Sequence, residues 1–312
     1  MGVSILIGDC RAKLQTLEAQ SVHTCVTSPP YFGLRDYGHA GQIGLEDTPD
    51  AFVAEMVAVF REVRRVLRDD GTLWLNLGDS YTTGASVSDR KSDPKAVGDV
   101  SKGMRRVGTP EGLKAKDLIG IPWRVAFALQ AAGWYLRQDI IWHKPNPMPE
   151  SVTDRCTKAH EYLFLLTKSE RYFWDADAMQ EQAVYAGVTG MDGSGFKPPQ
   201  DFAGKHAGGS ETLPPRKRVT GEHDGTRNRR SVWTVPTQPY AGAHFATFPP
   251  ALIEPCVLAG SRPGDVVLDP FMGSGTTAQV AQALGRQWIG CELNTEYAPL
   301  QQARTAQVAL AI

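Results

Sequence analysis

The stretch from Val266 to Ala278 constrains the fold more than any other part of this 312-residue sequence. The apolar run Val266 to Leu268 is typical of a parallel strand buried on both faces, and residues 278–284 then follow a helical pattern. Between them, Gly273 and Gly275 permit positive φ angles and the close approach of a ligand to the backbone. The stretch predicts a cofactor-binding turn between a strand and a helix.

A second apolar stretch, Gln287 to Cys291, ends in Glu292. A carboxylate at the end of the second strand accepts two hydrogen bonds from a ribose diol in nucleoside-binding folds. Glycine spacing alone is a weak indicator. The full order of strand, glycine turn, helix, strand and terminal acid is a much better one, and it predicts a nucleoside-containing cofactor.

The glycine turn lies late in the sequence, and this position indicates how the strands of the sheet are ordered along the chain. Only one helical stretch, Thr295 to Ala309, follows Glu292, whereas a dinucleotide-binding half requires further strands and helices. We therefore expect the remaining strands to come from upstream. The predicted fold is an α/β, circularly permuted, Rossmann-like sheet with irregular insertions.

The tetrapeptide Ser28-Pro29-Pro30-Tyr31 follows a predicted strand, Val22 to Thr27. Its prolines fix φ and keep the preceding residues extended, so the carbonyl groups of Ser28 and Pro29 point in set directions. Such acceptors suit an amino group on an aromatic ring, because they stabilise the nitrogen as charge develops during attack on a methyl group. We expect Tyr31 to stack on that ring. Taken alone, Pro-Pro-Tyr would indicate a rigid turn with a buried tyrosine.

Composition and charge limit the remaining possibilities. The net charge is −1, so an interaction with nucleic acid requires a local basic surface. Five cysteines without metal-ligand spacing indicate a reducing compartment and no metal. Without a signal peptide or a long apolar run, a cytoplasmic protein with no membrane segment is expected.

Two segments, residues 81–116 and 176–230, are irregular, and lysine and arginine outnumber acidic residues in the first of them and between Asp201 and Val232 in the second. On a nearly neutral protein this pattern favours a cleft for a polyanion. For the first segment, a basic loop over a site and a disordered, solvated insertion are almost equally compatible with the composition.

These motifs, in this order, resemble the DNA amino-methyltransferases of the β arrangement, in which the catalytic half precedes the S-adenosylmethionine half. The resemblance covers most of the chain outside the two basic segments. It is carried by Gly8-Asp9, Thr27 to Tyr31, Gly71 to Tyr81, Ile140 to Thr167 and His244 to Arg304.

The resemblance implies a division into a catalytic half (1–175), a target-recognition region (176–232) and a cofactor-binding half (233–312). It implies that Glu292 holds the ribose of S-adenosylmethionine and that Asp9 lies near the adenine, while Phe245 and Phe248 have core packing as a rival role. The residues that it places around the cofactor are Asp9, Phe245, Phe248, Pro249, Asp269, Phe271, Gly273, Gly275, Thr276 and Glu292.

The resemblance also implies which side chains act on the target. Ser28 to Tyr31 would be catalytic, and Asp79, Lys144 and Asn146 would lie near the target base, with helix capping as the rival role of Asp79. Basic side chains of the recognition region would contact DNA, namely Arg216, Lys217, Arg218, Arg227, Arg229 and Arg230.

The implied activity is sequence-specific methylation of duplex DNA, as in restriction–modification, at the exocyclic amino group of a flipped base. Serine at the first motif position is more typical of cytosine-N4 enzymes, but Ser-Pro-Pro-Tyr also occurs in adenine-N6 enzymes, so the base stays open. A homodimer is expected by analogy with the family. The alternatives are an amino-methyltransferase acting on RNA or protein glutamine, and a non-catalytic DNA-binding relative.

Overall fold

The computed structural model describes residues 3–82, 109–182, 226–238 and 248–309. The chain divides into two compact units, Met1–Ala178 with Arg230–Ile312, and Met179–Arg229. In the second unit, two short antiparallel strands pair with each other, β6 (Gln180–Gln182) and β7 (Thr226–Asn228). The division into catalytic, recognition and cofactor regions stays a prediction.

The first unit contains one eight-stranded, mostly parallel sheet in the order β1-β10-β9-β2-β3-β5-β4-β8. Only β5 runs antiparallel to its two neighbours, β3 and β4. The strands are β1 (Ser4–Ile7), β2 (Val22–Thr27), β3 (Leu67–Leu77), β4 (Tyr135–His143), β5 (His160–Thr167), β8 (Val232–Thr234), β9 (Val266–Asp269) and β10 (Gln287–Glu292).

The order of the strands confirms the predicted permutation. The late strands β9 and β10 lie between the early strands β1 and β2, so the sheet is completed from both ends of the chain. Because β2 and β9 are parallel neighbours, the turn after β2 and the turn after β9 emerge at the same edge of the sheet. In open α/β sheets that edge carries the ligand site.

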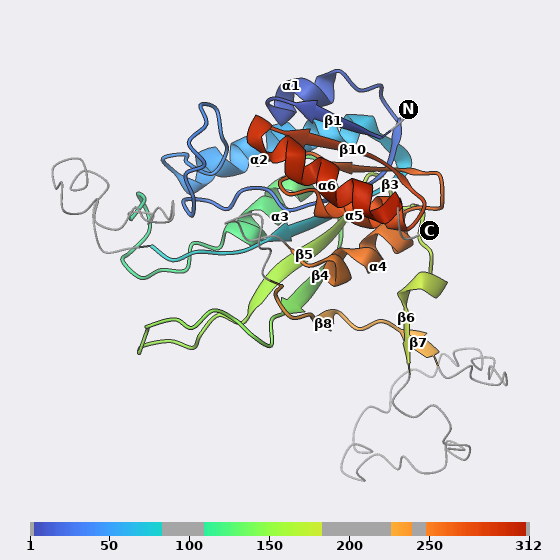
Figure 1. Cartoon of the computed structure of the whole chain (residues 1–312). Coiled ribbons are helices and arrows are strands. Elements are labelled where there is room, and N and C mark those ends of the chain that lie inside the picture. The colour runs from blue at the N-terminus through green and yellow to red at the C-terminus, as the bar shows by residue number, and fades with distance from the viewer. Residues whose placement is uncertain (1–2, 83–108, 183–225, 239–247, 310–312) are drawn as a thin grey trace, which may run out of the picture. The chain divides into compact units, whose positions relative to one another are not determined.

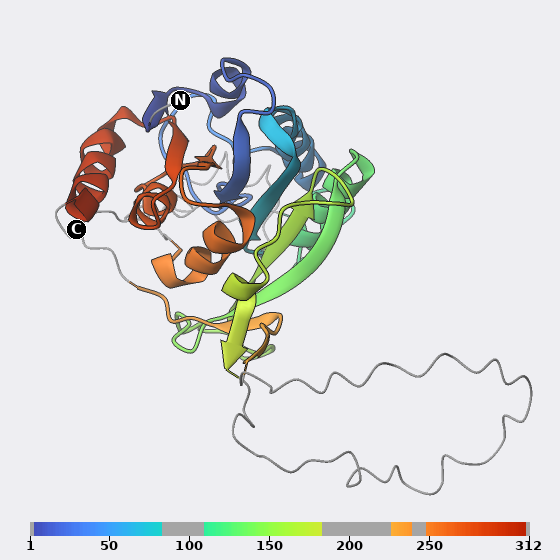
Figure 2. The ribbon, with the colours of Figure 1, turned by 90° about the vertical axis from the view of Figure 1, so that its right-hand side faces the viewer.

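Helices cover both faces of the sheet (Figures 1 and 2). The blue-to-green helices α1, α2 and α3 lie on one face, and the orange-to-red helices α4, α5 and α6 on the other. Their bounds are α1 (Cys10–Gln15), α2 (Pro49–Val66), α3 (Ile121–Ala131), α4 (Pro250–Gly260), α5 (Thr276–Ala283) and α6 (Ala298–Ala309).

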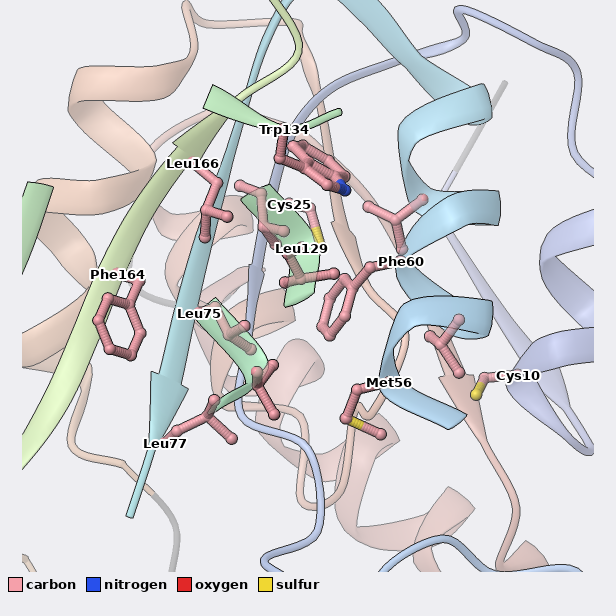
Figure 3. Close-up of a cluster of buried hydrophobic side chains, with 14 of the residues drawn as sticks. Cys10, Cys25, Met56, Phe60, Leu75, Leu77, Leu129, Trp134, Phe164 and Leu166 are labelled. Atoms are coloured by element: carbon pink, nitrogen blue, oxygen red, sulfur yellow. The ribbon is translucent and has the colours of Figure 1, made fainter. Parts of the chain in front are cut away.

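Helix α2 forms much of the core on its face of the sheet. Thr48 caps the helix by accepting a hydrogen bond from the Ala51 amide, and Pro49 occupies the first turn, as such a sequence predicts. Its buried residues Met56 and Phe60 pack toward β3, as Figure 3 shows beside Leu75 and Leu77. This packing fixes the position of β2 and β3, whose ends carry the target-side residues.

Candidate active site

A cavity of about 880 Å³ lies at the carboxyl ends of the parallel strands. The turn after β2 and the turn after β9 both line it. Of the predicted residues within the described ranges, those that line it are Asp9, Ser28, Pro29, Pro30, Tyr31, Asp79, Lys144, Asn146, Phe248, Asp269, Phe271, Gly273, Thr276 and Glu292.

Four predicted cofactor residues need separate comment. Gly275 is absent from the cavity lining, and a Cβ atom there would meet Gln301 and Met272 at 3.4 Å. Gly273 is different, because a Cβ atom there would meet nothing closer than 3.9 Å. Pro249 precedes α4 as its N-cap and does not line the cavity either, while Phe245 lies outside the described residues.

The buried carboxylate of Asp269 connects the two turns. It accepts hydrogen bonds from the hydroxyl groups of Thr27 (2.6 Å) and Thr277 (2.7 Å) and from the Phe271 amide (3.0 Å). Burial raises its pKa, and these three hydrogen bonds oppose the rise. Since Thr27 directly precedes Ser28, Asp269 fixes the start of the target-side turn relative to the cofactor-side turn.

Glu292 ends β10 at the predicted ribose position. Its Oε1 atom accepts a hydrogen bond from the Asn294 amide at 2.8 Å. Burial raises the pKa of Glu292 to about 7, although backbone hydrogen bonds from Asn294 and Gly273 partly offset this effect. A carboxylate that lines the cavity at the end of this strand suits a ligand with two hydroxyl groups.

Tyr31 reaches from the end of β2 toward β5. Its hydroxyl donates to Glu161 Oε2 at 2.5 Å and lies 3.2 Å from Asn76 Oδ1. The ring packs directly on Gly78, where a Cβ atom would overlap Tyr31 Cε2 and lie 3.0 Å from Cδ2. The tyrosine is therefore held at its hydroxyl and along one side of its ring.

Comparison with known proteins identifies the family. The model of the N6_N4_Mtase family, described as DNA methylase, matches residues 22–303. The chain is similar to the type II methyltransferase M.Cfr9I of Citrobacter freundii, with 50% identity over 299 residues that cover 95% of this chain and 85% of the relative. It is also similar to M.SmaI of Serratia marcescens, with 49% identity and coverage of 96% and 89%. The chain belongs to the N6/N4 DNA methylase family.

Solved structures agree with this assignment. The structure of TTHA0409 from Thermus thermophilus, complexed with S-adenosyl-L-methionine, matches with a TM-score of 0.60 and 25% identity, covering 99% of this chain and 96% of the other. The cytosine-N4-specific PvuII DNA methyltransferase has the same fold, with a TM-score of 0.62 and 19% identity, and the match covers 99% of this chain and 90% of the other. The predicted class, a DNA amino-methyltransferase with S-adenosylmethionine as its methyl donor, is confirmed.

In this DNA methylase the cofactor-side residues fit the methyl donor. The cavity is wide enough for a nucleoside with an amino-acid tail, since small-molecule sites span roughly 300–1,000 Å³. The open space beside Gly273 admits a close ligand, and Glu292 presents its carboxylate at the end of β10.

The predicted target-side residues of the methylase have partners within the protein. Asp79 accepts hydrogen bonds from the amides of Gly120 (3.0 Å) and Ile121 (3.1 Å), which is the rival capping role. Asn146 donates to the Thr237 carbonyl (3.2 Å) and accepts from its amide (2.9 Å). Lys144 forms an ion pair with Glu161.

The predicted DNA-contacting residues fall into three groups. Arg216, Lys217 and Arg218 lie outside the described residues. Arg227 is in the second unit, where its guanidinium pairs with Glu181 at 3.0 Å, and Arg229 is in the same unit, whereas Arg230 belongs to the first. Their contacts with DNA stay predictions.

The cavity residues that were missed from the sequence include Asn76, Lys158 and Glu161. Two of them did leave a signal, because Asn76 interrupts the apolar run of β3 and Glu161 stands at the start of an apolar strand. A polar residue in a buried strand requires a partner. Lys158 stands in a polar loop and left no such signal.

The part of the chain that the structure describes contains no group of three histidine, cysteine, aspartate or glutamate side chains arranged to hold a metal ion. Likewise, none of its described helices has the length and apolar character needed to cross a membrane. Cys256 is buried in α4, with its Sγ atom 3.6 Å from the Leu252 carbonyl, consistent with a structural thiol.

Proposed function

We propose that this DNA methyltransferase binds a flipped base beside Tyr31 and directs the amino group of that base to the carbonyl oxygens of Ser28 and Pro29. The observation that carries the proposal is that the turns after β2 and β9, on neighbouring parallel strands, open into one cavity. The base would enter on the β2 side and the methyl donor on the β9 side.

The reaction needs little beyond orientation and charge stabilisation. Bound S-adenosylmethionine supplies a methyl group on a positively charged sulfur. The two carbonyl groups accept hydrogen bonds from the amino protons, which favours the pyramidal nitrogen that attacks the methyl carbon as the carbon–sulfur bond breaks. The methylated nitrogen then releases one proton to reach its neutral form.

Cofactor contacts are assigned to the other turn. Glu292 would accept hydrogen bonds from the ribose hydroxyl groups, and the backbone at Gly273 would approach the methionine portion. Asp9 would lie near the adenine. Its carboxylate already pairs with Arg11 at 2.5 Å, and that partner lowers the pKa of Asp9, so it would act as an ionised acceptor.

The test is transfer of a labelled methyl group from S-adenosylmethionine to unmethylated duplex DNA, followed by digestion to nucleosides and identification of the product by mass. Ser28 favours N4-methylcytosine over N6-methyladenine. Tyr31→Ala should lose transfer while cofactor binding persists, because it removes the surface on which the base stacks. Transfer to RNA or protein without transfer to DNA would overturn the proposal, and gel filtration would test the predicted homodimer.

A further inference from the structure

Glu161 is the hub of a hydrogen-bond network at the target side of the cavity. Its Oε2 atom accepts from the Tyr31 hydroxyl (2.5 Å) and from Asn76 Nδ2 (3.2 Å). Its Oε1 atom accepts from the Lys144 ammonium. Glu161 lies on β5, 130 residues from Tyr31 in sequence, and Tyr31 follows β2, so this contact depends on how the strands pair in the sheet.

The network is rigid because each member has a second constraint. Asn76, 2% exposed, also donates to the Tyr162 carbonyl at 3.1 Å, which fixes the orientation of its amide. The Lys144 ammonium lies 4.4 Å from the centre of the Trp142 ring. The Lys144 and Glu161 side chains are 18% and 14% exposed, so their charges offset each other away from bulk water.

The ring of Tyr31 is constrained independently of its hydroxyl. A Cβ atom on Gly78 would overlap Cε2 and lie 3.0 Å from Cδ2 of the ring, so only glycine leaves room for it. Tyr31, Asn76, Lys144 and Glu161 all line the cavity, so the network faces the ligand site rather than the core.

We propose that Glu161, supported by Asn76 and Lys144, is a positioning residue that sets the angle of the Tyr31 ring against the flipped base. The inference rests on the proposed function of the cavity. Lys144, expected from the family resemblance to lie near the base, then acts through Glu161. Small errors in orientation reduce transfer strongly, because the amino group must meet both its acceptors and the methyl carbon.

A double-mutant cycle tests this positioning role. Tyr31→Phe removes the hydroxyl and Glu161→Leu removes its acceptor, and each should lower the single-turnover methylation rate about tenfold at saturating DNA and cofactor. If Glu161 acts through the hydroxyl, the double variant should be no slower than the slower single variant. Glu161→Gln, which keeps an acceptor oxygen, should retain most of the rate when Tyr31 is present and give no advantage over Glu161→Leu when combined with Tyr31→Phe.

Controls separate positioning from general stability. Glu62→Gln alters another ion-paired glutamate, which pairs with Arg65 on α2 and does not line the cavity, and it should leave the rate unchanged. If Glu161→Leu fails to fold, Glu161→Ala, which also removes the acceptor, takes its place in the cycle with Tyr31→Phe. A double variant about a hundredfold slower, or a Glu161→Leu variant with an unchanged rate, would overturn the positioning role. Wild-type protein that never methylates DNA would instead overturn the proposed function.

Lys158 carries a second, independent inference. Its ammonium nitrogen is buried and has no hydrogen-bond partner among the described residues, yet the side chain lines the cavity. Asp79, Glu150 and Glu161 lie near enough to influence its charge, but none bonds to it. An unpartnered buried donor is costly, and a ligand acceptor removes that cost.

The geometry points to Lys158 as a donor to an acceptor atom of the bound target nucleotide, either a ring atom of the base or a phosphate oxygen. Lys158→Met should weaken duplex binding about tenfold in the presence of a non-reactive cofactor analogue, with cofactor affinity unchanged. The slope of the logarithm of the binding constant against the logarithm of salt concentration identifies the acceptor. A slope reduced by about one would assign the contact to phosphate, and an unchanged slope would assign it to the base. Unchanged duplex affinity and an unchanged methylation rate would overturn this inference. Lys168→Met, which alters a lysine outside the cavity, is the matched control.

Discussion

The two turns that meet in the cavity are held in different ways. The cofactor-side turn after β9 is closed by its own backbone, with the Gly275 amide bonded to the Met272 carbonyl at 2.9 Å. A side chain of α6 also holds this turn, since Gln301 Nε2 donates a hydrogen bond to the Gly273 carbonyl at 2.6 Å. The target-side turn after β2 has prolines instead of glycines, and its Tyr31 is fixed by side chains 45 and 130 residues away.

This difference matches what each turn must do. The same cofactor binds in every reaction. Backbone groups suit such a ligand, because a side-chain substitution does not remove them. A base that enters only after leaving the duplex needs a stacking surface set at one angle, which side chains provide. We therefore expect substitutions at the cofactor side to alter cofactor affinity, and those at the target side to alter the rate of transfer.

The largest predicted effect is at Asp269, where the two turns are joined. Asp269→Ala leaves the buried hydroxyl group of Thr27 without its acceptor and leaves that of Thr277 only the Val26 carbonyl, at 3.2 Å. We expect a loss of about 3 kcal/mol in the free energy of unfolding, measured by urea denaturation, together with loss of cofactor binding. Asp47→Ala, at a residue that lines no part of the cavity, should change stability by less than about 0.5 kcal/mol. A stable Asp269→Ala variant would show that the turns are held independently.

The same difference decides how much could be predicted from the sequence. The cofactor-side turn is local, so consecutive residues from Val266 to Glu292 were enough to predict its strand, glycine turn and terminal acid. The late position of these residues also predicted that the sheet is permuted and completed by strands from upstream. On the target side, Ser28 to Tyr31 were found because prolines act locally. Glu161 was missed, because only the pairing of β3 with β5 brings it to Tyr31.

The prediction from local sequence also failed at one boundary, between α2 and β3, where tertiary packing overrides the local pattern. The helical spacing of apolar residues from Phe52 to Leu67 predicts a helix that ends at Asp70-Gly71 and a strand that begins at Thr72, and the structure contradicts this boundary. Helix α2 ends at Val66 and β3 begins at Leu67. The reason is that Leu67 already pairs with Val22 of β2. Strand pairing therefore begins at Leu67, four residues before Gly71.

A pair of glycine substitutions should separate the two sides. Gly78→Ala places a methyl group against the Tyr31 ring, 3.0 Å from Cδ2, and the hydroxyl contacts of that ring prevent it from moving freely. Gly290→Ala places a methyl group against Met272, 2.8 Å from its Cγ atom. Because Met272 belongs to the turn after β9, this substitution displaces the cofactor-side turn. We expect Gly78→Ala to lower single-turnover methylation on the order of a hundredfold with little change in cofactor affinity, and Gly290→Ala to do the reverse. Equal effects of both variants on both measurements would contradict the separation.

The cofactor side should also respond to pH. With its pKa raised to about 7, Glu292 is mostly protonated at about pH 6 and mostly ionised at about pH 8. If the ionised form binds the ribose, affinity for S-adenosylmethionine rises with pH, by about tenfold across this range. Calorimetric titration with S-adenosylmethionine at the two pH values measures this change in affinity. The Glu292→Gln variant is the comparison, because it should bind the cofactor weakly at both pH values. A wild-type profile parallel to that of Glu292→Gln would assign the pH dependence to another group.

The smallest predicted effect is at Asp79, which lines the target side but whose carboxylate accepts hydrogen bonds from the first amides of α3. Asp79→Ala removes this cap, which should lower the free energy of unfolding by about 1 kcal/mol. Because the carboxylate is occupied by backbone donors, we expect methylation well below the unfolding temperature to change by no more than about twofold. Asp79→Asn, which keeps one acceptor oxygen, should recover part of the stability. A rate loss of tenfold or more in a folded Asp79→Asn variant would instead assign Asp79 to the target base, and would extend the side-chain control of the target turn beyond Glu161.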